Sequence, residues 1–260
     1  MSKPLTIHPE LNNHNKKMQK KIICTNGYIH TAYAYAPSNM TIIEGDDGLI
    51  LVDTLPTLEF ADPVAKEIKK ITNKPIKAVI YTHVHPDHIS GVRAFINEED
   101  VDAGNIEIFA LEDLIPSLVR DSGVLAPVLA RRAMFAFGFQ LPLNEEGNVG
   151  AGLGPPNTPG QRSFIAPTKT FKGVMKSRIC GIDLELHHVP SETEDQVIVW
   201  LPKDKLLISA DVIQGQTFPN LYALRGTSFR DPMIWVDGID YIRRMEPETL
   251  IPHHGIPVSG

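Results

Sequence analysis

The most informative stretch of this sequence is "YTHVHPDHISG", which runs from Tyr81 to Gly91. It places three histidines and one aspartate within six residues, directly after the apolar run "IKAVI". The chain has only 10 histidines in 260 residues, so a cluster of three in one turn is unusual. A short, apolar, β-branched run of this kind is typical of a buried strand. The stretch therefore predicts a strand that ends in a loop of metal-binding side chains.

His83, His85, Asp87 and His88 offer the donor atoms that a divalent cation needs. A metal ion in a protein requires several nitrogen or oxygen donors that converge on one point. The pattern His-x-His-x-Asp-His supplies two donors to each of two neighbouring ions, and Pro86 stiffens the loop between them. A solvated, histidine-rich loop is the alternative, and it would suit a lone histidine better than this cluster. Four donors at this spacing favour metal binding.

Two donors for each ion do not complete a metal site, so the sequence predicts further ligands downstream. These ligands should follow strands and face the same edge of the fold. Taken alone, each candidate is equally well explained as a surface carboxylate or a capping residue. Together they supply enough donors for two sites. The candidates are Glu192 after "HHVPS", Asp211 at the end of "KLLISAD", and the pair His253 and His254 at the end of "LIPHH".

The composition bears on several classes of protein. Hydrophobic residues make up 42% of the chain, enough for a substantial core. The formal net charge of -6 argues against nucleic acid as a partner, because that affinity rests on clustered Lys and Arg. Cys24 and Cys180 are too few for a disulfide framework. No apolar run reaches the length of a membrane span. With no secretory signal at the N-terminus, we expect a cytoplasmic protein, or a periplasmic or secreted one if a signal has been removed.

The first half of the chain predicts a polar arm, a hairpin and a helix. Residues 1–20 are expected to form the arm, and residues 21–260 a single domain. "MTIIEG" and "LILVDT" flank "DDG", which is typical of a hairpin. In "DPVAKEIKKIT", Asp62 is expected to cap a helix that begins at Pro63. The inner face of that helix is then formed by Val64, Ile68 and Ile71.

The second half predicts a helical region, a long loop, three strands and a final helix. Residues 111 to about 139 are expected to be helical. "GNVGAGLGPPNTPG" is a Gly/Pro-rich loop that lacks the Lys-Ser/Thr of a phosphate-binding loop. "IDLELHHV", "QVIVWLP" and "KLLISADV" read as strands. Asp231 and Pro232 open a helix with Trp235, Ile239 and Ile242 on its inner face. This order suits an α/β (α+β) fold, with two sheets covered by helices on their outer faces.

"THVHPDH" and the order of the later ligand positions resemble the metallo-β-lactamase superfamily. More narrowly, the chain resembles the alkyl sulfatases of that superfamily. This resemblance covers nearly all of residues 25–255, and it implies a four-layer αββα sandwich with the metals at the shared edge of the two sheets. The motifs that carry it are "SNMTIIEGDDGLILVDTL", "KPIKAVIYTHVHPDHISGVRAF", "RRAMFAFG", "VGAGLG", "IAPTKT" and "NLYALRGTSFRDPMIWVDGID".

The resemblance implies a set of metal ligands. His83, His85 and Glu192 would hold a first divalent ion. A second would be held by Asp87, His88 and His254, with His253 as the alternate. His254 is favoured because the superfamily's last ligand directly precedes a glycine. Asp211 takes the bridging position, where alkyl sulfatases tend to carry glutamate. Asp53 is expected to orient a ligand histidine, and a strand-end cap is an equal alternative. Zinc is the metal we expect first, with manganese or iron as alternatives.

The resemblance also implies a hydrolase of small anionic esters. Two cations would activate a water, with the participation of Asp87 and Asp211, and the water would cleave an alkyl sulfate to alcohol and sulfate. Asn220 and Arg225 would hold the sulfate group, although Arg225 could instead serve a structural ion pair. Phe137 and Phe139 stand where alkyl sulfatases typically have a Tyr and an Asn that contact the sulfate. We therefore expect these two rings to line the substrate pocket.

Two other functions stay open at this level, and a third is disfavoured. The two phenylalanines favour a hydrolase of carboxylic esters, lactones or thioesters, whereas Glu192 and Arg225 disfavour it. A diiron redox module is less favoured, because such proteins usually carry Glu at the position of His85. A non-catalytic scaffold would lack some of the metal ligands, and none is missing.

Alkyl sulfatases usually continue with a helical dimerisation region and a sterol-carrier-like domain, whereas this sequence stops at "GIPVSG". We expect a catalytic domain without those parts, or a fragment, and leave a homodimer open.

Overall fold

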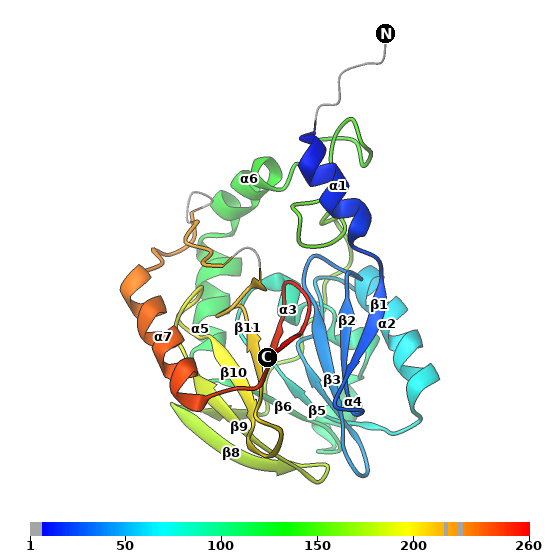
Figure 1. Cartoon of the computed structure of the whole chain (residues 1–260), viewed down its shortest axis with the longest axis vertical. Coiled ribbons are helices and arrows are strands. Elements are labelled where there is room, and N and C mark those ends of the chain that lie inside the picture. The colour runs from blue at the N-terminus through cyan, green and yellow to red at the C-terminus, as the bar shows by residue number, and fades with distance from the viewer. Residues whose placement is uncertain (1–6, 216–217, 223–225) are drawn as a thin grey trace.

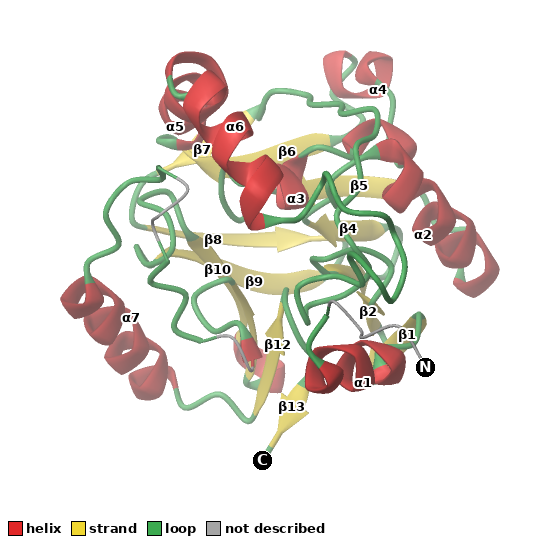
Figure 2. Cartoon of the chain, turned by 90° about the horizontal axis from the view of Figure 1, so that it is seen from above, coloured by secondary structure: helices red, strands yellow, loops and turns green. Residues whose placement is uncertain are grey.

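The computed structural model describes residues 7–215, 218–222 and 226–260. Two β-sheets stack face to face, and helices cover their outer sides (Figure 1). Seen from above, α2 and α7 lie on opposite flanks of the stacked sheets (Figure 2). The four-layer αββα sandwich predicted from the sequence is confirmed.

The first sheet contains seven strands in the order of the chain. Its strands are β1 (Lys21–Thr25), β2 (Ile29–Tyr33), β3 (Met40–Glu44), β4 (Leu49–Val52), β5 (Ile76–Ile80), β6 (Glu107–Leu111) and β7 (Lys169–Phe171). The second sheet contains six strands in the order β13-β12-β11-β10-β9-β8. These strands are β8 (Val174–Ile179), β9 (Ile182–His188), β10 (Val197–Leu201), β11 (Leu206–Ala210), β12 (Thr249–Pro252) and β13 (Val258–Ser259).

Helices connect the strands and cover both sheets. The α-helices are α1 (Pro9–Lys17), α2 (Leu58–Ile71), α3 (Pro86–Ile89), α4 (Glu98–Asp102), α5 (Leu114–Leu118), α6 (Ala126–Ala136) and α7 (Pro232–Met245). Short turns of other helix types are η1 (Val92–Ala94), η2 (Val119–Val124) and η3 (Pro202–Asp204). The helical region predicted for residues 111–139 is present as α5, η2 and α6, and the predicted Gly/Pro-rich loop contains no regular element.

Three layers of apolar side chains hold the sandwich together. Between the sheets, Ile50 and Ile80 of the first pack with Val199 and Ile208 of the second, and all four are fully buried. Burying one such side chain contributes about 1.5–3 kcal/mol. A second cluster lies under α2 and α4, and a third under α7. The central strands β4, β10 and β11 are buried on both faces because each sheet is covered on both sides.

The predicted hairpin and the predicted final helix are confirmed. β3 and β4 pair antiparallel, and Glu44 lies opposite Leu49. At the start of α7, the Asp231 side chain accepts a hydrogen bond from the Met233 amide at 2.8 Å. This cap satisfies one of the amides that the first helical turn leaves without an intrahelical partner. Trp235 and Ile242 are buried on the inner face of the helix.

Two local predictions in the first half are wrong. Helix α2 begins at Leu58, so that Pro63 lies inside it and Asp62 does not cap it. The earlier start is stabilised by a remote segment, since the Leu58 amide donates to the Gln161 carbonyl at 2.9 Å. Ile71, expected on the inner face, ends the helix and is 41% exposed.

The polar N-terminal segment contains an ordered helix rather than a loose arm. Pro9 occupies the first turn of α1, where its missing amide hydrogen costs nothing. The helix lies against the 145–152 segment: Lys16 pairs with Glu145 at 2.5 Å, and the His14 ring bonds to the Gly152 carbonyl at 2.9 Å. These long-range contacts could not be predicted from the local sequence.

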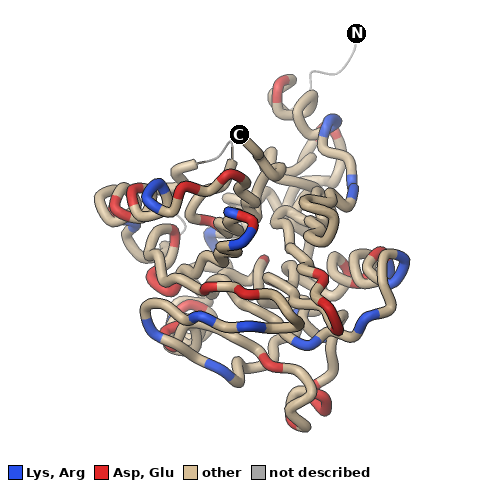
Figure 3. Tube along the Cα trace, turned by 60° about the horizontal axis from the view of Figure 1, so that its bottom comes forward, with Lys and Arg blue, Asp and Glu red and all other residues tan. Residues whose placement is uncertain are grey.

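Charged residues of both signs are interspersed along the chain (Figure 3). On the outer strands of the second sheet, Lys176 pairs with Glu185 and Arg178 pairs with Asp183 across β8 and β9. Within the described ranges, no helix has both the length and the apolar character needed to cross a membrane.

Candidate metal centre

The strands of both sheets deliver the predicted donors to one edge of the sandwich. β5 ends at Ile80, and the chain then turns through the histidine stretch into the short helix α3. Glu192 follows β9, Asp211 follows β11, and His254 follows β12. The strand-end positions on which the prediction depended therefore converge in space.

Asp211 lies at the centre of the cluster. Its Oδ2 atom is 3.1 Å from His254 Nε2, 3.4 Å from His88 Nε2 and 3.8 Å from His83 Nε2. Its side chain is 2% exposed. One carboxylate oxygen thus faces three imidazole nitrogens that come from two different segments of the chain.

The remaining predicted ligands surround this centre. Asp87 Oδ2 is 3.5 Å from His88 Nε2 and 3.6 Å from His254 Nε2. On the other side, His85 Nδ1 is 3.8 Å from Glu192 Oε1. Among the described residues, ligand atoms within 4.8 Å of one another form four groups: His83, His88 and Asp211; Asp87, His88 and His254; His85, Glu192 and Asp211; and Asp53, His88 and His253.

His253 and His254 face different partners. His254 Nε2 points to Asp211, while its Nδ1 bonds to the Pro37 carbonyl at 2.9 Å. His253 uses Nδ1 on Asp53 Oδ2 at 2.6 Å, and its Nε2 lies 3.2 Å from the hydroxyl of Thr41. Both ring nitrogens of His253 are therefore engaged away from Asp211, and His254 is the one that reaches the donor cluster.

Asp53 holds the histidines from behind. It is fully buried, and its Oδ2 accepts hydrogen bonds from Nδ1 of His88 at 2.7 Å and from His253. Its Oδ1 accepts from the Thr82 amide at 2.8 Å. The contact to Nδ1 leaves His88 Nε2 directed at Asp87 and Asp211. The backbone of Asp53 is in the left-handed region, at φ 64°, which Asp tolerates better than most residues.

Burial and charge shift the acidity of several histidines in opposite directions. Burial, and then the charge of the neighbouring His88, lower the pKa of His83 to about 3. For His254, burial also acts to lower the pKa, but the Asp211 charge outweighs it and raises the pKa to about 9. The charges of Asp211, Asp87 and Asp53 likewise outweigh burial and hold the pKa of His88 well above its usual value.

Burial and neighbouring charges also shift the pKa values of the carboxylates in opposite directions. Burial, and then the charge of Asp211, raise the pKa of Glu192 to about 8. For Asp211, burial opposes ionisation, yet His254 and His88 hold the pKa well below its ordinary value. At neutral pH, His88 and His254 therefore carry protons that a bound cation would displace.

The donor set fits a divalent cation. His88 Nε2 and Asp211 Oδ1 are buried and have no hydrogen-bond partner within the described part of the chain. Buried polar atoms are rarely left in this state, so each one requires an explanation. Imidazole nitrogens and carboxylate oxygens are ligands that zinc accepts.

Glu192 is surrounded by polar residues, two of which the sequence did not single out. Asn220 Nδ2 donates to Glu192 Oε1 at 2.8 Å, and Arg230 lies 2.8 Å from the same oxygen. The Gln214 amide donates to Glu192 Oε2. Arg230 and Gln214 were missed because nothing in their local sequence marks them as buried; Asp231, the predicted cap, directly follows Arg230.

Of the residues expected to bind substrate, Asn220 reaches the cluster, and Arg225 lies outside the described residues. Phe137 and Phe139 follow α6, with ring centroids 5.7 Å apart. The structure does not bring them to the pocket beside His85 and Glu192.

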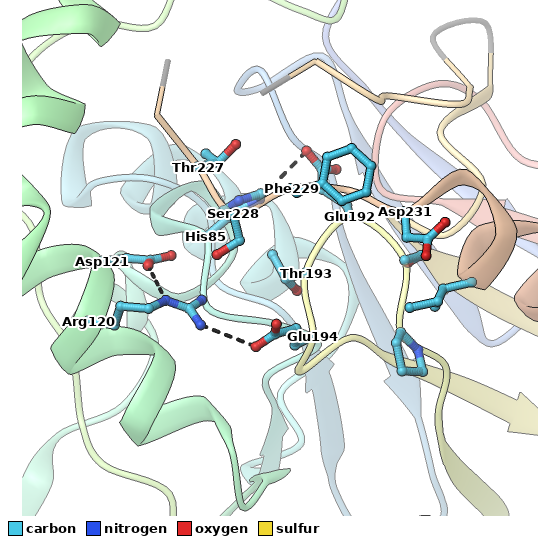
Figure 4. Close-up of a pocket in the computed structure, with 13 residues that line it drawn as sticks. His85, Arg120, Asp121, Glu192, Thr193, Glu194, Thr227, Ser228, Phe229 and Asp231 are labelled. Carbon is cyan, nitrogen blue, oxygen red and sulfur yellow. Dashed lines mark hydrogen bonds and ion pairs between the residues drawn. The ribbon is translucent and has the colours of Figure 1, made fainter. Parts of the chain in front are cut away.

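That pocket opens next to the donor cluster (Figure 4). On one side Arg120 pairs with Asp121 at 2.8 Å and with Glu194 at 3.2 Å. Phe229 and Ile234 supply apolar surface on another side. The pocket thus combines polar and apolar walls beside His85 and Glu192, as a site for a small amphiphile requires.

The sequence matches the metallo-beta-lactamase superfamily over residues 35–254, and the chain belongs to this superfamily. It is 44% identical over 219 residues to the linear primary-alkylsulfatase of Pseudomonas sp. (strain ATCC 19151), across 84% of this chain and 42% of that protein. It is 34% identical over 229 residues to alkyl/aryl-sulfatase BDS1 of Saccharomyces cerevisiae, across 86% of this chain and 35% of that protein.

A solved structure gives the same relationship. That of the stereoselective inverting sec-alkylsulfatase Pisa1 from Pseudomonas sp. has a TM-score of 0.90 and 30% identity, and the match covers 100% of this chain and 42% of that one. The resemblance to alkyl sulfatases inferred from the sequence is confirmed. The chain spans less than half the length of these relatives.

Proposed function

We propose that this protein is a metal-dependent alkyl sulfatase, which hydrolyses an alkyl sulfate ester to an alcohol and sulfate. Its similarity to linear and secondary alkylsulfatases supports the proposal. The observation that carries it is the position of Asn220. This residue was expected to hold the sulfate group, and its side-chain amide lies 2.8 Å from Glu192 Oε1, at the edge of the donor cluster.

The cofactor in this proposal is a pair of divalent cations, with zinc expected first. Bound cations of this kind supply Lewis acidity, which attracts the charge of the sulfate ester and lowers the pKa of nearby water. The unpartnered His88 Nε2 and Asp211 Oδ1 support cation binding at the centre of the cluster. The residues that would hold the pair are His83, His85 and Glu192 for one ion and Asp87, His88 and His254 for the other, with Asp211 between them.

Three residues of the protein would orient, hydrogen-bond or balance the charge of the reacting groups. Asp53 fixes the His88 ring through Nδ1, so that Nε2 does not need to reorganise during the reaction. Asp87 is the most exposed carboxylate of the cluster, at 27%, so an attacking water can reach it and donate a hydrogen bond to it. Arg230 balances the charge of Glu192 from a position that is 1% exposed.

The substrate would lie between the cluster and the pocket. Asn220 can donate to a sulfate oxygen, because its side-chain amide is a donor at the boundary between them. The apolar faces of Phe229 and Ile234 suit the organic part of the ester. Arg225 stays a predicted sulfate ligand.

Sulfate release tests the proposal. Zinc-loaded protein, chelator-treated protein and an Asn220→Ala variant would be incubated with dodecyl sulfate, and free sulfate would be measured by ion chromatography. A lactone and an aryl carboxylic ester would be assayed in parallel. We expect zinc-dependent sulfate release, and a higher KM in the variant because it removes a contact to the sulfate group. Turnover of the lactone or ester without sulfate release would contradict the proposal.

A matched control separates the loss of a contact from the loss of an amide. Asn148→Ala removes a buried amide near Phe137, where it donates to the Phe137 carbonyl at 2.8 Å, away from Glu192. It should leave the KM for dodecyl sulfate unchanged. Carrying out the reaction in ¹⁸O-labelled water would show which bond breaks: label in the alcohol means C–O cleavage, and label in the sulfate means S–O cleavage.

A further inference from the structure

Gln214 connects the two carboxylates that come from different strands of the second sheet. It lies three residues after Asp211, in the turn that follows β11, and it is 3% exposed. Its side-chain nitrogen donates to Asp211 Oδ2 at 2.9 Å and also to Glu192 Oε2. A primary amide carries two hydrogens, so one nitrogen can serve both carboxylates at once.

Such a link has a physical purpose at this position. Glu192 and Asp211 are 5% and 2% exposed, and two carboxylates buried side by side repel each other. A neutral donor between them partly compensates both without adding charge. It also fixes their rotation: with Oε2 engaged by Gln214, Glu192 Oε1 faces His85 Nδ1 at 3.8 Å.

We propose that Gln214 is a positioning residue of the metal centre, which sets the spacing and rotation of Glu192 and Asp211 through its side-chain amide. This inference rests on the proposed metal site. It extends that site by a residue that is not among the predicted metal ligands or substrate contacts. Residues that orient metal ligands typically contribute 10–100-fold to metal affinity or activity.

Zinc titration of the Gln214→Leu variant tests the inference without any substrate. Affinity would be measured by competition with a chromophoric chelator, for wild type and variant, after thermal unfolding has shown that both are folded. We expect zinc affinity to fall about 10–100-fold, because leucine fills the space without donating to either carboxylate. If the leucine variant does not fold, Gln214→Asn serves instead, since its shorter amide cannot reach both carboxylates.

A double-mutant cycle shows whether Gln214 acts through Glu192. In the Glu192→Gln background the carboxylate is already lost, so Gln214→Leu should cost at least 5-fold less affinity than it costs in wild type. The matched control is Asn12→Leu, a buried amide on α1, which should leave zinc affinity unchanged. In sulfate release, Gln214→Leu should lower kcat more than it raises KM, because the substrate contact at Asn220 remains.

Two results would overturn the inference. One is zinc affinity within about 2-fold of wild type in the folded Gln214→Leu variant. The other is an equal loss in the wild-type and Glu192→Gln backgrounds, which would show that Gln214 does not act through Glu192. Zinc binding by wild type without any sulfate release would instead contradict the proposed function and leave the role of Gln214 intact.

Discussion

Replacing Asp53 with asparagine tests how the metal centre is held in place. Asp53 is fully buried, and Nδ1 of His88 and of His253 donates to its Oδ2 atom at 2.7 and 2.6 Å. An asparagine side chain offers one acceptor oxygen where the carboxylate offers two, and it carries no charge. At least one charge-assisted hydrogen bond is therefore lost, and each is worth about 1.5–3 kcal/mol.

We expect Asp53→Asn to reduce the free energy of unfolding by about 2–4 kcal/mol at pH 7, measured by urea denaturation of the metal-free protein. Zinc affinity should fall about 10–100-fold, because the His88 ring is no longer fixed. The control is Asp183→Asn, whose partner Arg178 is 64% exposed and whose loss should cost less than about 1 kcal/mol.

The pH dependence of this difference has a definite sign. Burial opposes ionisation of Asp53, but His88 and His253 outweigh it and hold the pKa of Asp53 below its ordinary value. A carboxyl with a lowered folded-state pKa stabilises the protein above its unfolded pKa of about 3.9, and this contribution is lost as the pH falls further. The gap between wild type and Asp53→Asn should therefore be full at pH 7 and shrink below about pH 4. A variant within about 0.5 kcal/mol of wild type, with unchanged zinc affinity, would refute the role of Asp53.

Three further outcomes follow from the same geometry. The raised pKa of His254, about 9, means that the folded metal-free protein retains a proton that the unfolded chain has released. Its stability should fall as the pH rises from about 6.5 to 8, and urea denaturation in chelator should show this; a rise over that interval would contradict it. His254→Ala should lower zinc affinity more than His253→Ala, because His254 faces Asp211 whereas His253 faces Asp53. Calorimetric zinc titration of the two variants would compare their affinities. A larger loss in His253→Ala would make His253 the metal ligand instead. Arg230→Met should destabilise the protein by about 3–5 kcal/mol, because it leaves the buried Glu192 carboxylate without its positively charged partner. Chemical denaturation would measure this cost. A cost below about 1 kcal/mol would show that Glu192 does not need Arg230.

The residues at strand ends were predictable from the sequence because their position follows from a simple rule. An apolar run followed by a polar donor places that donor at the edge of a sheet, and His83, Glu192, Asp211 and His254 all follow this pattern. The four-layer αββα architecture came from the resemblance to a known superfamily. Hydrophobic patterns alone would have predicted only two covered sheets.

The supporting residues could not be predicted in the same way. Asp53 could be interpreted equally well as a residue that orients a ligand histidine or as a strand-end cap. The contacts that decide between them join residues 35 positions apart, to His88, and 200 positions apart, to His253. Arg230 and Gln214 are polar residues whose burial depends on tertiary packing. The start of α2 at Leu58 depends on a hydrogen bond to the distant Gln161 carbonyl. In each case the deciding contact is non-local, so no window of sequence contains it.

The most direct test of the central claim is the release of inorganic sulfate from dodecyl sulfate by the zinc-loaded protein. We predict sulfate release that stops with a chelator, returns with zinc, and is lost in the Glu192→Ala variant while this variant stays folded. Zinc binding by the cluster without sulfate release, or sulfate release that persists in chelator, would contradict the assignment of this site as a metal-dependent alkyl sulfatase.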